Sequence, residues 1–155
     1  WETIFLKENV IAIGWEGIPT LSPEMSKEQV RTLVRKNSPG DSEKEVDTAA
    51  NTIKKFLDIK QDDIIVICRG YSANQKRDVH IYGIARVTGP FYAAEPPTNA
   101  WRFKHDAIIQ PINKGIPKDT LAKAFERGTM RQTLHKLNKA HFDRFTEELG
   151  IPIIV

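Results

Sequence analysis

The chain has 155 residues, of which 40% are hydrophobic and 28% are charged, and its formal net charge is +3. This length and composition are typical of one globular domain, so we expect a single domain over residues 1–155. No apolar run approaches the ~18 residues of a membrane helix, which excludes a spanning segment. The one cysteine, Cys68, excludes an intrachain disulfide and favours a reducing, cytoplasmic location. Because the sequence opens on Trp1, we expect a domain excised from a longer protein.

Four elements are predicted before residue 60: a short helix over 1–9, a strand over 10–14, and helices over 27–36 and 42–58. Both longer helices open on the spacing of a capping box, in which Ser26 is followed by Gln29 and Ser42 by Glu45. The polar cluster at 37–41 separates them.

The second half predicts strands over 63–69, 79–89 and about 103–112, helices over 117–128 and 129–150, and a terminal strand over 151–155. Residues 63–69 form a continuous apolar run, which is typical of a strand buried on both faces. Gly83 marks a bulge or a close backbone approach. Residues 90–99 contain three prolines, and we expect them to be irregular. Strands and helices do not alternate regularly, so the fold class is predicted to be α+β.

Charge is distributed unevenly along the chain. Residues 99–144 contain ten lysines and arginines against four acidic residues. A basic face of this kind attracts a phosphate backbone. A solvated helix surface would have the same composition, and both interpretations stay open.

Catalytic and metal-binding motifs are absent from the sequence. There is no phosphate-binding glycine loop, no nucleophile elbow and no pair of metal-binding cysteines. His135 and His141 are six residues apart and do not share a helical face. Cys68 lies in the strand predicted to be buried, where a thiol has a raised pKa and is hidden. We therefore expect no catalytic residue, no metal and no cofactor.

Aromatic residues gather at the predicted loops. Trp15 follows an apolar strand and stands next to Gly14, which lets the backbone turn sharply. The other aromatic residues at breaks are Tyr71, Phe91, Tyr92, Trp101 and Phe103. Rings at one rim of a sheet can sandwich a base, and such stacking contributes about 1–3 kcal/mol per base. The alternative for each ring is packing against a helix, with Trp15 as a lid on the core.

Four segments together resemble the EVE family of the PUA-like superfamily. They are NVIAIGWEGIP at 9–19, NTIKKFLDIKQDDIIVI at 51–67, VHIYGIARVTGPFY at 79–92 and WRFKHDAIIQP at 101–111. The resemblance covers nearly the whole chain in the expected order. It implies a curled mixed sheet, or pseudo-barrel, of about five or six strands with helices outside.

The resemblance also implies a function. EVE domains are sisters of YTH domains, which hold a methylated base in an aromatic cage, and are similar to the DNA-reading modules of McrBC-type restriction systems. Trp15 with Pro19 matches the first element of the YTH motif. The second wall of the cage would come from Phe91, Tyr92 or Trp101, and Glu16 would contact the base.

We therefore expect a non-enzymatic reader that flips a modified base, a methylated adenine or a modified cytosine, out of double-stranded DNA. Glu16, Asn74 and Asn99 are the polar candidates for the base edge. The expected backbone contacts are Arg69, Lys76, Arg77, Arg102 and Lys104, with Arg127 and Arg131 as a second strip. A fused or partner nucleotide-driven motor or nuclease would complete the system. The alternatives are a protein-interaction module, an RNA-binding PUA-like domain, and an enzyme that acts on a nucleotide.

Overall fold

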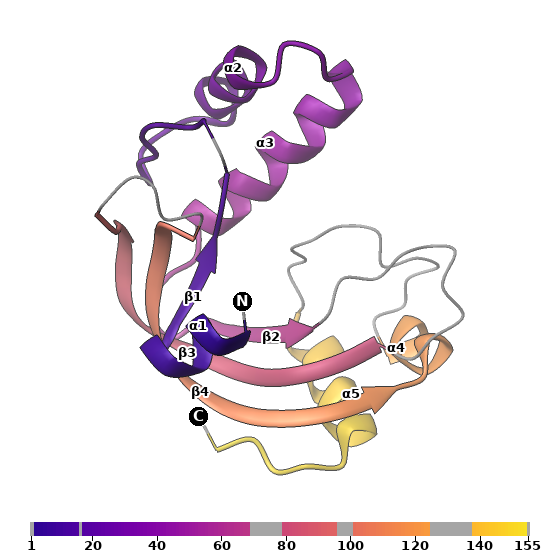
Figure 1. Ribbon diagram of the computed structural model, residues 1–155. Coiled ribbons are helices and arrows are strands. Elements are labelled where there is room, and N and C mark those ends of the chain that lie inside the picture. Colours follow the sequence, from indigo (N-terminus) through magenta and orange to yellow (C-terminus); the bar gives the residue numbers. More distant parts are fainter. Residues whose placement is uncertain (1, 16, 69–78, 96–100, 125–137, 155) are drawn as a thin grey trace.

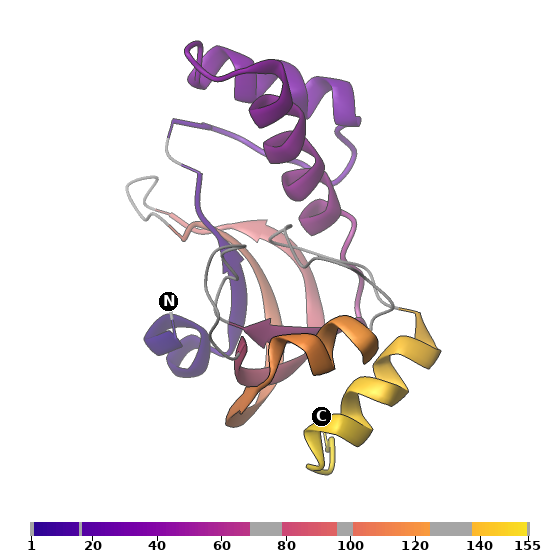
Figure 2. The ribbon, with the colours of Figure 1, turned by 90° about the vertical axis from the view of Figure 1, so that its right-hand side faces the viewer.

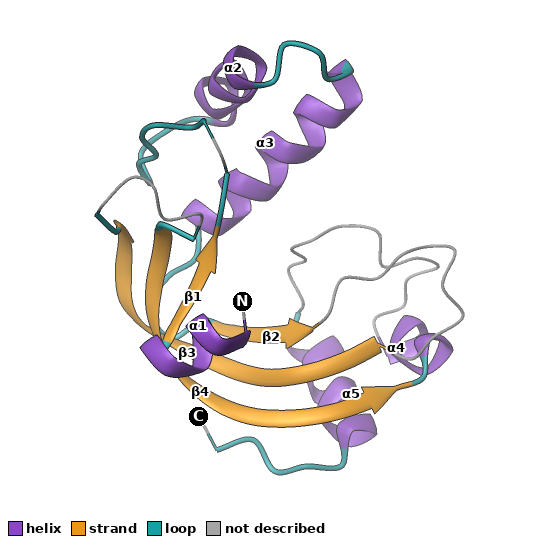
Figure 3. Ribbon diagram, in the orientation of Figure 1, coloured by secondary structure: helices purple, strands orange, loops and turns teal. Residues whose placement is uncertain are grey.

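The computed structural model describes residues 2–15, 17–68, 79–95, 101–124 and 138–154. Its elements are α1 (Glu2–Glu8), β1 (Val10–Ile13), α2 (Lys27–Asn37), α3 (Glu43–Leu57), β2 (Ile64–Cys68), β3 (Val79–Ala93), β4 (Phe103–Ile116), α4 (Lys118–Ala124) and α5 (Lys139–Leu149). Helices and strands mix along the chain without a repeating unit (Figure 3). The predicted α+β class is confirmed.

One sheet organises the molecule. Its strand order is β1-β4-β3-β2, and each neighbouring pair is antiparallel. The part of the chain that the structure describes therefore holds four strands in an open sheet, and the expectation of five or six strands in a mixed sheet is wrong for these residues. Antiparallel order follows from the long β3–β4 hairpin, which forms the centre of the sheet and leaves one short strand on each side (Figure 1).

Strand β2 differs from the expectation that it is buried on both faces. It pairs with β3 alone, so it is an edge strand within the described sheet. Ile64 is 37% exposed, and Cys68 at the far end is exposed as well. The apolar run therefore indicates a half-covered edge, and the expectation that Cys68 is hidden is wrong. Desolvation nevertheless raises the pKa of the Cys68 thiol, as the sequence predicted.

Helices α2 and α3 form as their end signals predict. The Ser26 and Ser42 hydroxyls each accept the backbone N–H three residues on, and the Gln29 and Glu45 side chains return to the cap backbone. An ion pair of 2.7 Å between Arg31 Nε and Asp47 Oδ1 joins the two helices.

None of the helices in the described ranges is long and apolar enough to cross a membrane.

The β3–β4 hairpin is longer than predicted. Residues 90–93 continue β3, and 91–93 pair with the start of β4, so the expectation that this proline-containing stretch is irregular is wrong for these four residues. The register shifts between Val87 and Phe91, and Pro90 lies within that shift, where no ladder hydrogen bond needs its missing N–H. The prediction for Gly83 is confirmed, because the register also shifts there and a Cβ atom would lie 2.9 Å from the Gln110 carbonyl oxygen.

The last helix begins later than predicted. Its N-cap is Asn138, and the side chain of Asn138 accepts the His141 N–H at 2.8 Å. The backbone of Asn138 is extended, so the predicted helix over 129–150 is not continuous through this residue. Residues 125–137 lie outside the described part of the chain. Gly150, with φ of 61°, ends α5 as expected.

No strand forms over the described residues 151–154, contrary to expectation. The Gln110 side chain takes the place of a ladder partner, because it donates to the Pro152 carbonyl at 2.7 Å and accepts the Ile154 N–H at 2.9 Å. The tail is thus fixed along β4 by a side chain.

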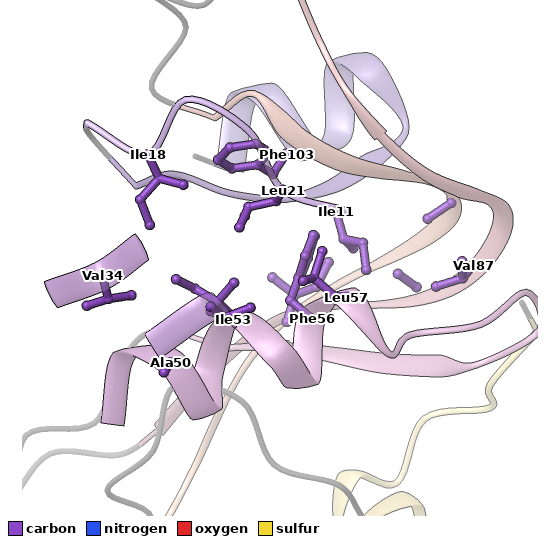
Figure 4. Packing of buried hydrophobic residues seen from close by; sticks show 14 of the residues in the cluster. Ile11, Ile18, Leu21, Val34, Ala50, Ile53, Phe56, Leu57, Val87 and Phe103 are labelled. Carbon is purple, nitrogen blue, oxygen red and sulfur yellow. The ribbon is translucent and has the colours of Figure 1, made fainter. Parts of the chain in front are cut away.

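Two hydrophobic cores lie between the sheet and the helices. The first core lies beneath α2 and α3, and its close packing is visible in Figure 4. Its buried residues are Ile11, Ile18, Leu21, Val30, Val34, Val46, Ala50, Ile53, Phe56, Leu57, Ile67, Ala85, Val87, Phe103 and Ala107. The second core joins β3 and β4 to α4 and α5 at the other end of the molecule (Figure 2). Its buried residues are Val79, Ile81, Ile84, Ile116, Leu121, Ala124, Phe145 and Leu149.

Candidate nucleic-acid interface

The strand register brings three predicted site residues to one end of the sheet. Ile13 of β1 pairs with Phe103 of β4, and Phe103 pairs with Ala93 of β3. Trp15 lies two residues beyond Ile13, while Trp101 and Arg102 directly precede Phe103. We call residues 14–15, 94–95 and 101–102 the rim. Figure 1 shows this end of β1, β3 and β4 lying next to α2 and α3.

A hydrogen bond extends the hairpin into the rim. The Ala94 N–H donates to the Arg102 carbonyl oxygen at 2.7 Å, one step beyond the last paired residues. The backbone at Arg102 is therefore held by the sheet. The described residues of the rim therefore lie at one end of the sheet, whereas Phe91 and Tyr92 lie within β3.

Trp15 is half-buried. Its ring packs against the edge of the first core, and its carbonyl oxygen accepts the Ile18 N–H at 3.4 Å. Gly17, with φ of 81°, makes the turn between them, and Ile18 is buried behind it. This turn presents part of the indole to solvent and holds the rest on the core, so the ring has features of both a lid and a stacking platform.

Trp101 is also half-buried, and helix α1 supports it. Its ring meets the Phe5 ring edge to face, with centroids 6.1 Å apart and planes at 85°. Phe5 itself packs against the first core. The aromatic contact gives Trp101 a defined support on one side.

Phe91 and Tyr92 point to opposite faces of the sheet, as neighbouring strand residues must. Phe91 stacks on Phe103, with centroids 6.1 Å apart and planes at 16°, and packs against the first core. Tyr92 is 37% exposed, and its hydroxyl donates to Asp106 Oδ1 at 3.1 Å. The two rings therefore do not form one wall together, and Phe91 follows the alternative interpretation of packing against the core.

The environment of Tyr92 raises its pKa to about 12. Desolvation is the largest cause, followed by the hydrogen bond to the Asp106 carboxylate and by the negative charges of Asp106 and Glu8. The phenol thus stays protonated at neutral pH and acts as a hydrogen-bond donor.

We expect Asp106→Asn to move the pKa of Tyr92 back towards 10, because the substitution removes a charged acceptor. The folded pKa is raised, so the stabilisation that the phenol contributes is complete below pH 10 and disappears as the pH rises through about 12. Ultraviolet titration of tyrosinate, with Tyr92→Phe to identify the Tyr92 signal, measures the shift. An unchanged titration in Asp106→Asn would contradict this assignment.

The two described basic candidates each lie near one acidic side chain of the chain, at very different distances. Lys104 is 5% exposed and forms an ion pair with Glu8 of α1. The Arg102 side chain is 11% exposed and lies 3.8 Å from the Glu95 carboxylate. Lys104 is therefore neutralised by its own chain, and we leave it out of the proposed surface.

Several candidates lie outside the described residues, and their positions stay predictions. They are Glu16, Arg69, Asn74, Lys76, Arg77, Asn99, Arg127 and Arg131. Within the ranges that the structure describes, no three histidine, cysteine, aspartate or glutamate side chains gather as metal ligands would.

Sequence reasoning missed His105, which is 1% exposed beneath the rim strands. Its Nε2 lies 3.2 Å from the Phe56 carbonyl oxygen at the end of α3, and its Nδ1 lies 3.4 Å from the Gly89 carbonyl oxygen of β3. The alternation of Phe103, His105 and Ala107 along one strand was the available signal, because these three residues share the buried face.

The open antiparallel sheet, with helices over both of its ends, defines an α+β domain whose candidate site lies at a strand rim. Residues 2–138 match the model of a protein family described as Domain of unknown function (DUF8426), and the chain belongs to that family. No curated protein and no solved structure matches the chain.

Proposed function

We propose that this domain is a reader that binds a modified base in DNA, with the base flipped out of the duplex and stacked on Trp15. The observation that carries the proposal is the strand register, which supplies the rim with Trp15 from one side and Trp101 and Arg102 from the other. Two half-buried aromatic rings and a guanidinium that start from one end of the sheet would suit a planar, electron-rich ligand.

The half-buried state of both tryptophans supports binding over a purely structural role. A ring that is only half-buried keeps apolar surface to bury when a ligand arrives. Removing a base from its stack costs a few kcal/mol, and stacking on aromatic side chains returns about 1–3 kcal/mol per base. A cage of two rings is therefore of the right order to offset flipping.

The PUA-like fold of the EVE type belongs to this proposal. Three sequence segments support this fold: AIGW at 12–15, DDIIVI at 62–67 and YGIARVTGPF at 82–91. The curled antiparallel sheet also supports it (Figure 1). Glu16 and Asn99 remain our candidates for the base edge. The domain would act as the targeting part of a modification-dependent restriction system and work with a fused or partner motor or nuclease.

The test is direct binding of the chain to matched duplexes. The duplexes share one sequence and carry either no modification or a single N6-methyladenine, 5-methylcytosine or 5-hydroxymethylcytosine. A single-stranded RNA tests whether the chain binds RNA instead. We expect one modified duplex to bind at least several-fold more tightly than its unmodified partner. Trp15→Ala should remove this preference, and Trp15→Phe, which keeps a ring, should retain part of it.

Stability and salt controls make the result interpretable. Thermal melting must show that both Trp15 variants are folded at the assay temperature. Binding at two salt concentrations separates phosphate contacts, which weaken steeply as salt rises, from other contacts. Equal binding to every duplex, or a preference that survives Trp15→Ala, would contradict the proposal.

A protein-interaction module is the second candidate, and one observation favours it. Ile64 of β2 and Ile108 of β4 flank Arg86 in a single cross-strand row, and they are 37% and 49% exposed. Exposed apolar side chains in one row are a feature of contact surfaces. If this candidate is correct, Ile108→Asp abolishes binding to a partner protein while Trp15→Ala leaves that binding unchanged.

A further inference from the structure

Arg102 is a buried charge with incomplete compensation. Its side chain is only 11% exposed, and its guanidinium carbon lies 5.2 Å from the centroid of the Phe103 ring. The Nε atom is buried and donates to no hydrogen-bond acceptor among the residues that the structure describes. The distance of 3.8 Å from Nη2 to Glu95 Oε1 is too long for a hydrogen bond, and the Glu95 side chain is 71% exposed.

This arrangement is unfavourable for the isolated domain. A guanidinium remains charged at every physiological pH, so it cannot reduce the cost of burial by losing a proton. An unpaired N–H group in the interior carries its full desolvation penalty. A loose contact with an exposed carboxylate offsets little of it, because such pairs contribute little in water. The Arg102 guanidinium thus has a donor, at Nε, that no described residue accepts.

Arg102, which carries this unused donor, is itself a residue of the rim. The hydrogen bond from Ala94 fixes its backbone, and the Phe103 ring lies against its guanidinium. Trp101 is its neighbour in the chain, and the register places Trp15 at the same end of the sheet. The backbone of Arg102 therefore starts from the same end of the sheet as Trp15 and Trp101, and the Phe103 ring supports its guanidinium.

We propose that Arg102 reads the acceptor edge of a flipped cytosine-type base, so that the ligand of the rim is a modified cytosine and not N6-methyladenine. This inference rests on the proposed function. A guanidinium has five donors and no acceptor, so it needs a partner that presents adjacent acceptors. Cytosine presents N3 and O2 side by side, and a substituent at C5 leaves both free.

Adenine does not meet this requirement. On its pairing edge the acceptor N1 stands beside the N6 amino group, which is a donor and keeps one hydrogen after methylation. Such an edge requires a side chain with both a donor and an acceptor, which asparagine and glutamine provide and arginine does not. Stacking by Trp15 and Trp101 accepts any base, so Arg102 would set the choice between the two classes.

A backbone phosphate also presents paired acceptors to arginine. Substitutions of Arg102 distinguish a contact with the cytosine edge from a contact with a phosphate. The full chain is titrated with duplexes that carry 5-methylcytosine, N6-methyladenine or neither, at several salt concentrations. We expect wild-type chain to prefer 5-methylcytosine, and Arg102→Gln to lose roughly tenfold or more of that preference. We expect Arg102→Lys to lose it as well, because an ammonium keeps the charge but not the planar pair of donors.

The salt dependence and the stability of the variants complete the test. If Arg102 contacts a phosphate instead, Arg102→Gln weakens all duplexes alike and lowers the salt slope by about one unit, which overturns the inference. Arg102→Met should melt no lower than wild type, since it removes an uncompensated charge and keeps an apolar stem. A lower melting temperature with an unchanged base preference would assign Arg102 a purely structural role.

The outcomes also separate this inference from the proposed function. A chain that prefers N6-methyladenine, and loses this preference in Trp15→Ala, is a reader in which the inference about Arg102 is wrong. A chain without any preference contradicts the proposed function itself.

Discussion

Phe103→Ala is expected to lower the free energy of unfolding by about 3–5 kcal/mol, the usual cost of removing a buried phenylalanine. Phe103 is fully buried and belongs to the first core. Its ring stacks on Phe91 at 6.1 Å and lies beneath the Arg102 guanidinium. Alanine would leave a cavity between β4 and the helices, and the Phe91 ring and the Arg102 guanidinium would lose their support.

Urea unfolding followed by circular dichroism measures this change. Ile108→Ala is the matched control, because Ile108 lies on the same strand with its side chain 49% exposed. We expect the control to lose less than about 1 kcal/mol. Equal losses in the two variants would contradict the burial pattern of β4, and with it the register that defines the rim.

His105→Ala is expected to lower the free energy of unfolding by about 2–4 kcal/mol. The ring lies between the last turn of α3 and β3, with carbonyl oxygens 3.2 Å from Nε2 and 3.4 Å from Nδ1, and a neutral imidazole donates to one of them. Its edge contacts with Phe56, at 5.1 Å, and with Phe91, at 5.8 Å, add packing. Alanine removes the polar bridge and the packing together, in a place where water would have to enter the first core.

His80 provides the comparison for this substitution. It is half-buried, and its Nε2 lies 2.6 Å from the Asn113 side-chain oxygen. His80→Ala should cost less than about 1 kcal/mol, because water can replace a partner on an accessible surface. If His105→Ala were as mild as His80→Ala in the same urea experiment, the bridge between α3 and β3 would be energetically unimportant.

Local signals in the sequence predicted most of the elements. The two capping boxes located the starts of α2 and α3 because their hydrogen bonds lie within four consecutive residues. Gly83 could be interpreted for a similar reason, since a strand glycine marks a bulge or a close neighbour. Trp15 and Trp101 were singled out as aromatic residues at breaks beside predicted strands, and Arg102 as a contact for the nucleic-acid backbone.

Features that depend on partners far along the chain were not predictable. Residues 90–93 join β3 because β4 pairs with 91–93, which outweighs the effect of Pro90 on the local structure. Strand β2 is apolar but lies at an edge, and only the strand order shows this. Lys104 appeared to be a free cation, and its partner Glu8 is 96 residues away in sequence.

The central claim is that a base leaves the duplex and stacks on Trp15, and fluorescence of 2-aminopurine tests it most directly. The probe is placed next to the modified base, where it brightens when its neighbour leaves the stack. We expect the wild-type chain to raise the emission several-fold with the modified duplex and little with the unmodified one, and Trp15→Ala to remove the rise. Tight binding of the modified duplex without a rise in emission would contradict the account.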